Sequence, residues 1–216
     1  MVSHADLDHA GGLRAVLKSV PVDTAYASFD MGKHVAREDA ADAQVPLSEP
    51  TPLPTNMAPC LAGEAWDQDG VRFRFIHPRP LGESNLKHRK ADGNAESCVL
   101  VIEGAHHKAV LPGDVGVAQE RRLLDVGQVD VVFAGHHGSA TSSSRAWTEA
   151  LRPLHVIVQA GYLNRFRHPA NVVVNRWRRV GAQVARTDRD GAITVMSSGA
   201  ELIAVGERSM ARRYWR

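Results

Sequence analysis

The chain has little cysteine, few aromatic residues and no long apolar run. Cys60 and Cys98 are its only cysteines in 216 residues and they form no Cys-x-x-Cys motif. This excludes a cysteine-rich disulfide scaffold and disfavours a cysteine zinc site, while a single disulfide and two buried thiols both stay open. No apolar run reaches the length of a membrane span, and no signal peptide opens the chain.

The remaining composition is that of an ordinary globular protein. Hydrophobic residues make up 44% and charged residues 23% of the chain, which is enough for one domain with a real core. The net charge of +2 gives no global signal for nucleic acid, but residues 207–216 alone contain four arginines. We therefore assign residues 1–200 to one domain and residues 201–216 to a basic C-terminal tail.

Hydrophobic periodicity alternates between helical and extended patterns along the chain. Helices are expected at residues 13–20, 119–126, 143–151 and 171–180. Strands are expected at residues 22–28, 71–77, 98–103, 108–112, 129–134, 156–160, 183–186 and 192–196, the last two flanking the Asp190-Gly191 turn. The proline-rich stretch 37–57 is expected to be an exposed loop. These elements predict a layered α/β fold with polar residues at strand ends along one edge of the sheet.

The densest group of metal-binding side chains lies at the N-terminus. His4, Asp6, Asp8 and His9 fall within six residues, directly before Ala10-Gly11-Gly12. Histidine prefers Zn, Mn or Fe, whereas carboxylates prefer Mn, Mg or Ca. The mixed set predicts a hydrolytic centre with two ions, and a solvated polar loop is the alternative. Because such loops usually follow an anchoring strand, we expect an N-terminally truncated domain.

Two further polar clusters follow predicted strands. Asp114 comes directly after Gly113, where its carboxylate could bridge two ions, although an ordinary Gly-Asp turn is the simpler alternative. The sequence His136-His137-Gly138-Ser139 follows the most hydrophobic strand. On a loop, one of two adjacent imidazoles can bind a metal while the other faces substrate. A surface histidine pair is the alternative there.

A basic loop, Asn164 to Pro169, follows the strand predicted at 156–160. His168 in this loop is suited to act as a general acid, and Arg165 or Arg167 could hold a phosphate. A basic surface loop without a role in catalysis is the alternative.

These clusters together resemble the metallo-β-lactamase fold superfamily, whose metal loop is usually His-x-His-x-Asp-His. Asp6 stands where the second histidine is expected. That variant, together with the later clusters, resembles the C-terminal domain of the ComEC family of DNA-internalisation proteins of natural competence. The stretches that carry the resemblance are 94–97, 113–114, 136–139 and 164–169, with Cys60 to Gly63, Trp66 and Asp69 to Phe73 resembling the proteobacterial form.

The resemblance implies an α/β fold of the metallo-β-lactamase-like αβ/βα sandwich type, N-terminally truncated. It implies two divalent metal ions, Mn or Zn with Mg as a further option. The implied metal ligands are His4, Asp6, Asp8, His9, Asp114 as the bridging carboxylate, and His137; the implied catalytic residues are Asp8 and His168. The implied substrate-binding residues are His136, Ser139, Asn164, Arg165 and Arg167. Asn94 and Ser97 lie where hydrolases of this fold often carry another histidine ligand.

The function implied is that of a metal-dependent hydrolase, a nuclease domain that cleaves phosphodiester bonds of single-stranded or double-stranded DNA during DNA uptake. The resemblance also implies a partner, the membrane-channel portion of a split ComEC-like protein, and a location at the periplasmic face of the inner membrane. Two alternatives stay open. One is another hydrolase of this fold that acts on a small ester, thioester or lactam. The other is an inactive fragment that binds DNA through residues 208–216 by counterion release.

Overall fold

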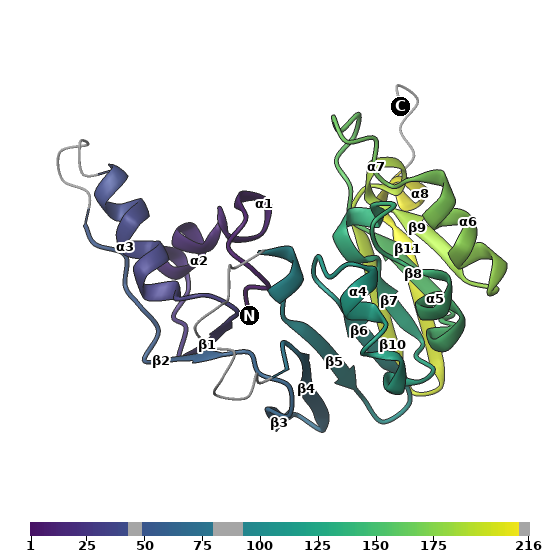
Figure 1. Cartoon of the computed structure of the whole chain (residues 1–216), viewed down its shortest axis with the longest axis horizontal. Helices are drawn as coiled ribbons and strands as arrows, with labels where there is room; N and C mark the ends of the chain where they lie inside the picture. The colour runs from purple at the N-terminus through teal and green to yellow at the C-terminus, as the bar shows by residue number, and fades with distance from the viewer. Residues whose placement is uncertain (43–48, 80–92, 212–216) are drawn as a thin grey trace.

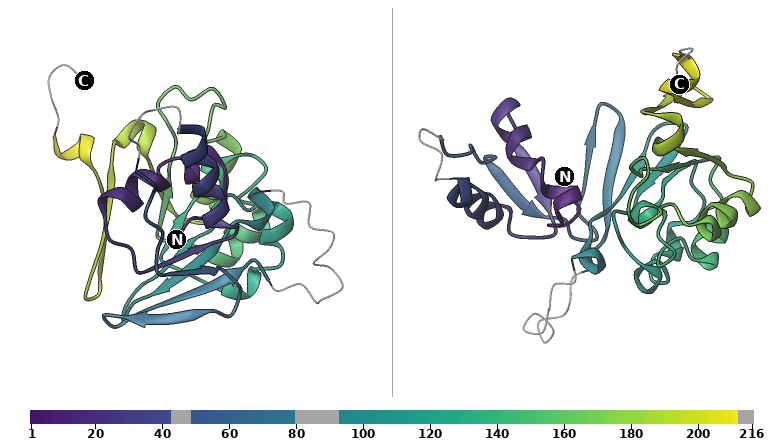
Figure 2. Two further views of the ribbon diagram at one scale, coloured as in Figure 1. Left: turned by 90° about the vertical axis from the view of Figure 1, so that its left-hand side faces the viewer. Right: turned by 90° about the horizontal axis from the view of Figure 1, so that it is seen from above.

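The computed structural model describes residues 1–42, 49–79 and 93–211, and it contains two parts that lie side by side (Figure 1). The first part holds three helices and a two-stranded parallel sheet. Its elements are α1 (Leu7–Ala10), α2 (Leu13–Ser19), β1 (Thr24–Ala27), α3 (Met31–Asp42) and β2 (Asn56–Pro59). The view from above in Figure 2 separates this part from the larger sheet and its helices.

The second part is built on a seven-stranded mixed sheet in the order β3-β4-β5-β6-β7-β8-β9. Its strands are β3 (Ala65–Gln68), β4 (Val71–His77), β5 (Val99–Glu103), β6 (Lys108–Leu111), β7 (Val131–Phe133), β8 (His155–Val158) and β9 (Gln183–Arg186). Strands β3 to β6 pair antiparallel, and β6 to β9 pair parallel. The carboxyl ends of β6, β7 and β8 therefore meet at one edge of the sheet.

Helices cover one face of this sheet. They are α4 (Val117–Glu120), α5 (Arg145–Leu151) and α6 (Asn171–Arg179). Three short helices lie between strands: η2 (Asn94–Glu96) before β5, η3 (Leu124–Val126) before β7 and η4 (Gly135–Gly138) after β7. The main core forms where Trp147 of α5 and Trp177 of α6 pack on buried valines of the strands. Alternate residues of β5 point to opposite faces, so that Val99 and Val101 enter this core while Leu100 packs on the other side.

The other face of the sheet meets the first part of the molecule. Tyr26 of β1 stacks on Trp66 of β3 with ring centroids 5.0 Å apart, and Trp66 stacks on Phe73 at 5.1 Å. A disulfide between Cys60 and Cys98 joins the two parts, which settles the question that the sequence left open. This aromatic cluster and the disulfide together fix the N-terminal residues against the sheet.

A C-terminal hairpin follows the large sheet. Strands β10 (Ile193–Ser198) and β11 (Glu201–Gly206) pair antiparallel, between the short helices α7 (Thr187–Asp190) and α8 (Glu207–Met210). The domain boundary that we placed at residue 200 falls inside this hairpin, because residue 201 begins a paired strand. Residues 212–216 of the expected tail lie outside the described residues. No helix in the described part of the chain is long and apolar enough to cross a membrane.

Most predicted elements are confirmed, and two predictions are wrong. The stretch 37–57 is not all loop, since α3 extends through Asp42. The four prolines that suggested a loop all follow the helix in sequence, so they do not disrupt it. The helix expected at 119–126 is broken into α4 and η3. Both strands expected on either side of Asp190-Gly191 are present, and each pairs elsewhere: β9 joins the large sheet and β10 pairs with β11.

Candidate metal centre

The site lies at the sheet edge where three strand ends and the N-terminal loop converge. Asp114 follows β6, the two histidines of η4 follow β7, and the loop 159–168 follows β8. The N-terminal loop reaches this edge because Val2 N–H donates to Tyr26 of β1 and Ser3 accepts a backbone hydrogen bond from Cys98. Residues far apart in the sequence are thus brought to one point by the parallel strand order.

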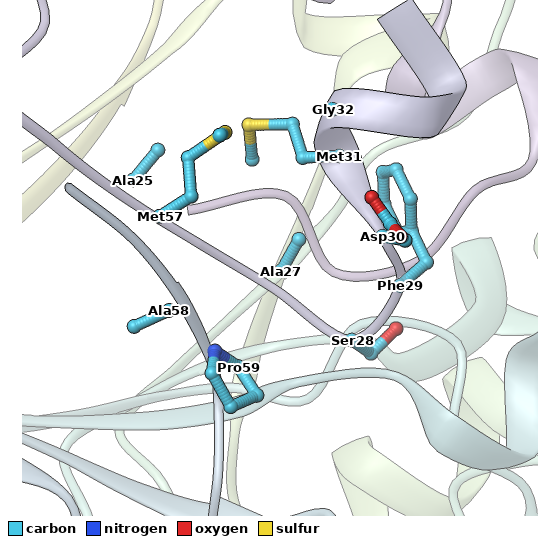
Figure 3. Close-up of a pocket in the computed structure, with 10 residues that line it drawn as sticks. All are labelled: Ala25, Ala27, Ser28, Phe29, Asp30, Met31, Gly32, Met57, Ala58 and Pro59. Atoms are coloured by element: carbon cyan, nitrogen blue, oxygen red, sulfur yellow. The ribbon is translucent and has the colours of Figure 1, made fainter. Parts of the chain in front are cut away.

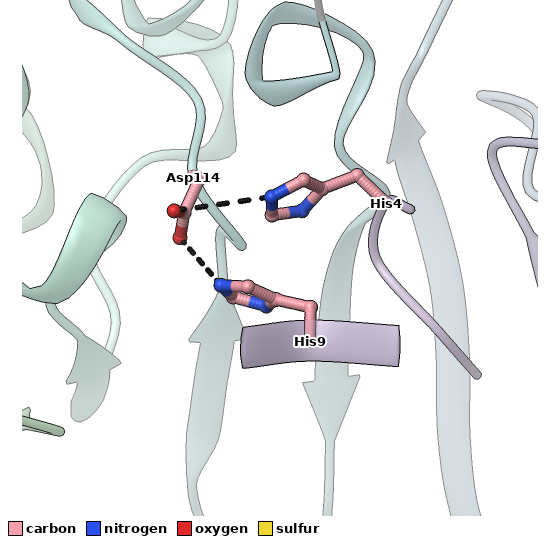
Figure 4. A group of neighbouring side chains, drawn as sticks. All are labelled: His4, His9 and Asp114. Atoms are coloured by element: carbon pink, nitrogen blue, oxygen red, sulfur yellow. Dashed lines mark ion pairs between the residues drawn. The ribbon is translucent and has the colours of Figure 1, made fainter. Parts of the chain in front are cut away.

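The first ligand group is formed by His4, His9 and Asp114, and both imidazoles point at the carboxylate (Figure 4). The Nε2 atom of His9 lies 3.3 Å from one oxygen of Asp114, and the Nε2 atom of His4 lies 4.0 Å from the other. Asp6 extends this group, since its Oδ2 atom lies 3.7 Å from His4 Nε2. These atoms surround a position where one ion would be shared between nitrogen and oxygen donors.

The second group is formed by Asp8, His9 and His137. The Nε2 atom of His137 lies 3.2 Å from both the Oδ2 atom of Asp8 and the Nε2 atom of His9, and 3.8 Å from Asp114. His137 also donates a hydrogen bond through Nδ1 to the backbone oxygen of Gln159 at 2.9 Å. Because a carbonyl can only accept, the Nδ1 atom carries the proton and the Nε2 lone pair faces the other ligands.

The donors of this site fit a divalent metal. The Nε2 atom of His4 is fully buried and has no hydrogen-bond partner among the residues that the structure describes. Buried polar atoms are nearly always satisfied, so an orphaned imidazole nitrogen aimed at two carboxylates is best explained as a metal ligand. His9 Nε2 can bind only one ion, so it would serve one of the two groups and not both.

Two serines that sequence reasoning did not select as site residues hold the histidines in place. The hydroxyl of Ser3 lies 3.1 Å from Nδ1 of His4 and 3.0 Å from Nδ1 of His9. The hydroxyl of Ser97 lies 3.2 Å from the same His4 atom and accepts the backbone N–H of Asp114 at 3.1 Å. Ser97 thus supports a ligand at the place where a further histidine was considered. The only signal for Ser3 was its position directly before the motif.

Charge within the site favours ionised Asp114 and an uncharged His4. Burial lowers the pKa of His4, and the neighbouring His9 lowers it further. Burial by itself would raise the pKa of Asp114, but the hydrogen bond from His9 and the attraction of the nearby imidazoles hold it below its ordinary value. The same attraction to Asp114 outweighs the burial of His9 and raises the pKa of that imidazole. A deprotonated carboxylate and a neutral imidazole are the forms that bind metals.

The η4 turn aims its two histidines in different directions. His136 and His137 adopt φ angles of 50° and 53°, a left-handed conformation that costs about 1–2 kcal/mol per residue for L-amino acids. Gly138 continues the turn at φ 78°, where an added Cβ would lie 2.6 Å from Pro169. His137 faces the second ligand group, whereas Nε2 of His136 lies 3.9 Å from Asp114 on the side of His168. Strained backbone of this kind is typical of functional sites.

Two residues expected to bind substrate have other contacts. The hydroxyl of Ser139 lies 2.9 Å from that of Thr141, within the turn that follows η4. The side chain of Asn164 braces its own loop: its amide donates to the backbone oxygens of Gly161 and His168, and its oxygen accepts the His168 N–H at 2.9 Å. We assign Asn164 a positioning role for His168, while Arg165 and Arg167 are exposed on the same loop.

Comparison with known proteins identifies the family. The sequence pattern of the Metallo-beta-lactamase superfamily matches residues 1–161. The chain belongs to the metallo-beta-lactamase superfamily. The predicted family and the metallo-β-lactamase fold are therefore confirmed, and the superfamily typically binds divalent metals, in agreement with the donor set described above.

Among curated proteins, this metallo-beta-lactamase chain is similar to proteins named for competence and recombination. It is 31% identical to "Competence protein ComA" of Neisseria gonorrhoeae, over 89% of this chain and 24% of that protein. It is 34% identical to "ComE operon protein 3" of Bacillus subtilis (strain 168), over 89% of this chain and 24% of that protein. It is 29% identical to "Recombination protein 2" of Haemophilus influenzae, over 90% and 22%. The chain spans about a quarter of the length of these relatives.

Hollows beside the metal centre leave room for a substrate of the metallo-beta-lactamase domain. One has a volume of about 640 Å³ and is lined by Asp8, His137, Phe166 and His168, among others. A second, of about 580 Å³, lies on the side of Asp114 and His136 and is also lined by Phe166 and His168. The loop 161–168 thus stands between two cavities that both reach the ligands.

A separate cavity in the first part of the molecule is not suited to this chemistry (Figure 3). It has a volume of about 430 Å³ and is mostly apolar, with Met31 and Met57 extending toward each other across it. Of its lining residues only Asp30 is ionisable, and that carboxylate pairs with Lys33 at 2.9 Å. The sheet edge is therefore the better candidate for a catalytic centre.

The two serine contacts predict a loss of metal affinity in Ser3→Ala. Without this hydroxyl, Nδ1 of His9 loses its partner and Nδ1 of His4 keeps only Ser97, so the two rings are held less firmly with Nε2 toward the metal positions. We expect the affinity for Mn or Zn to fall about 10- to 100-fold, the usual effect of removing a group that orients a ligand. Titration calorimetry measures this, with Ser198→Ala in the exposed hairpin as the control; an unchanged affinity would contradict the role of Ser3.

Proposed function

We propose that this chain is a metal-dependent nuclease domain that hydrolyses phosphodiester bonds of DNA. The observation that carries the proposal is the pair of ligand groups that converge on neighbouring positions beside a basic loop. Two-metal sites of this kind suit phosphoryl chemistry, because two adjacent cations can stabilise both the attacking and the leaving oxygen. The arginines of the loop supply the positive charge that a phosphate backbone requires.

The two metal positions differ in their donors. One would be held by Asp8, His9 and His137, and the other by His4 and Asp6, with Asp114 between them. The first set has two imidazoles and suits Zn or Mn, whereas the second has one imidazole and two carboxylates and suits Mn, with Mg as a further option. When bound, the ions would activate water as a nucleophile at neutral pH and offset charge on the phosphate.

Side chains of this protein would donate a proton to the leaving oxygen and bind the phosphates of the DNA. The carboxylate of Asp8 is more than half exposed at the cavity, where it can orient a water as well as bind metal. Burial lowers the pKa of His168, and the nearby His136 lowers it further. A lower pKa leaves less of the His168 ring protonated at neutral pH, so its donation of a proton to the leaving oxygen would be favoured below neutral pH. Arg165 and Arg167 would bind flanking phosphates.

The relatives and the disulfide support the wider setting of the proposal. Two of the similar proteins are named for competence or recombination, and both functions concern DNA. Because this chain matches only about a quarter of each, we propose that its partner is a membrane-channel portion of a ComEC-like protein. A Cys60–Cys98 disulfide is stable outside the reducing cytoplasm, which supports a periplasmic location of the domain.

The test is metal content and DNA cleavage of the same purified protein. After dialysis we expect about two ions per chain, and with added Mn we expect chelator-sensitive cleavage of DNA oligonucleotides. Bound metal with hydrolysis of small esters or lactams but no DNA cleavage would favour another hydrolase of this superfamily. DNA binding that is steeply salt-dependent and unaffected by chelator, with no cleavage, would identify a DNA-binding fragment.

A further inference from the structure

The loop above the metal centre carries a stack of aromatic and cationic side chains. The ring of Phe166 lies 5.7 Å from that of His168 with an interplanar angle of 17°, a stacked arrangement. The guanidinium of Arg165 lies over the Phe166 ring, 4.7 Å from its centroid. The His168 ring in turn meets His136 edge-on at 6.0 Å. The stack therefore runs from the loop surface to the histidines beside Asp114.

Phe166 is 63% exposed, although it belongs to a rigid loop. Asn164 ties both ends of the loop by hydrogen bonds to Gly161 and His168, and Pro169 packs against Gly138. The loop thus holds an apolar ring in water without gaining core contacts from it. Single exposed hydrophobic side chains are common on protein surfaces, so it is the position of Phe166 beside two cavities at the candidate metal centre, not its exposure alone, that suggests a binding role.

The surroundings of Phe166 indicate what this ring binds. Phe166 and His168 line both cavities next to the ligands. A further hollow of about 610 Å³ continues from the loop and is lined by Arg165, Arg167 and Arg189. An exposed aromatic ring beside arginines and the candidate metal centre matches an unpaired nucleotide. Because His168 stacks on the ring and Arg165 lies over it, the base would displace the Arg165 guanidinium, which would then meet a neighbouring phosphate.

We propose that Phe166 is a base-stacking residue that makes the site selective for single-stranded DNA over duplex. In a duplex both faces of each base are already stacked on neighbours, so an inserted ring must first unstack a base pair. An unpaired base meets no such cost. The inference rests on the proposed nuclease function for the identity of the ligand, but stacking can be measured without cleavage.

The experiment measures binding of a short phosphorothioate oligonucleotide that contains 2-aminopurine, whose fluorescence is quenched when it stacks. Phe166→Ala is expected to weaken binding of the single strand about tenfold and to lose most of the quench. Phe166→Trp is expected to retain both, whereas Phe166→Leu, which keeps apolar volume without a π face, is expected to behave like Phe166→Ala. Leu154→Ala is the control, because Leu154 is 55% exposed and lines none of the three hollows around the loop.

Comparison with a duplex of the same sequence completes the test. The wild-type protein is expected to prefer the single strand, and Phe166→Ala is expected to reduce that preference. Equal affinity of Phe166→Leu and wild type, or an equal loss for single strand and duplex, would overturn the inference. If the wild-type protein cleaves DNA but Phe166→Ala binds normally, the inference fails while the nuclease function stands. If quenching depends on Phe166 but the wild-type protein does not cleave DNA, the base-stacking inference stands while the nuclease function fails.

Discussion

Replacing Asp114 by asparagine is expected to lower metal affinity more than 100-fold and to abolish metal-dependent hydrolysis. The Asp114 carboxylate lies within 4.0 Å of Nε2 of four imidazoles, those of His4, His9, His136 and His137. Asparagine keeps the shape of the side chain but removes its negative charge and one of its two oxygen donors. The remaining oxygen could not bridge the two proposed metal positions. Removing a group that only orients a ligand costs about 10- to 100-fold, and a bridging ligand must cost more.

Metal content after dialysis and the rate of DNA cleavage in Mn measure this effect. Asp125→Asn is the matched control, because Asp125 is exposed and pairs with Arg79 away from the site. Circular dichroism of both variants checks that the fold is retained. An Asp114→Asn protein that keeps its ions and its activity would show that the two ligand groups are not a joint centre.

Removing the Cys60–Cys98 disulfide is expected to lower the free energy of unfolding by about 4 kcal/mol. The bond closes a loop with a sequence separation of 38 residues, and cross-links of this length remove much of the entropy of the unfolded chain. The bond also joins the end of β2 to the start of β5, next to Ser97 and the backbone contact of Ser3. Loss of the bond therefore loosens the attachment of the N-terminal ligands to the sheet.

Urea denaturation of Cys60→Ala/Cys98→Ala measures this prediction. The wild-type protein under reducing conditions is the control and is expected to unfold at a similar urea concentration as the double variant. Both are expected to bind metal more weakly than the oxidised protein, because the ligand loop is less well fixed. A double variant as stable as the oxidised wild type would show that the aromatic cluster of Tyr26 and Trp66 alone holds the two parts together.

Local sequence pattern predicted most of the strands but not how they pair. Alternating side chains predicted β4, because a strand with one buried face leaves a period of two in the sequence, and a short continuous apolar run predicted the buried strand β5. Helix α3 was missed because its residues have weak amphipathic character and adjoin the prolines. The sequence pattern did not give the partner of β9, because its pairing with β8 is a contact between residues distant in sequence.

The sequence by itself determined which residue types the site has: histidines and carboxylates that can bind a metal at strand ends, and arginines on the following loop that would attract the proposed phosphate. Only the tertiary structure decided how these groups are used. The positive φ angles of η4 turn His137 toward Asp8 and His9, the sheet brings Ser97 against His4, and the brace of Asn164 holds Phe166 in solvent. Which side chains can bind a metal follows from residue type, which the sequence gives directly. The orientation and exposure of these side chains arise from contacts between residues far apart in the sequence, such as Ser97 with His4, which no local pattern encodes.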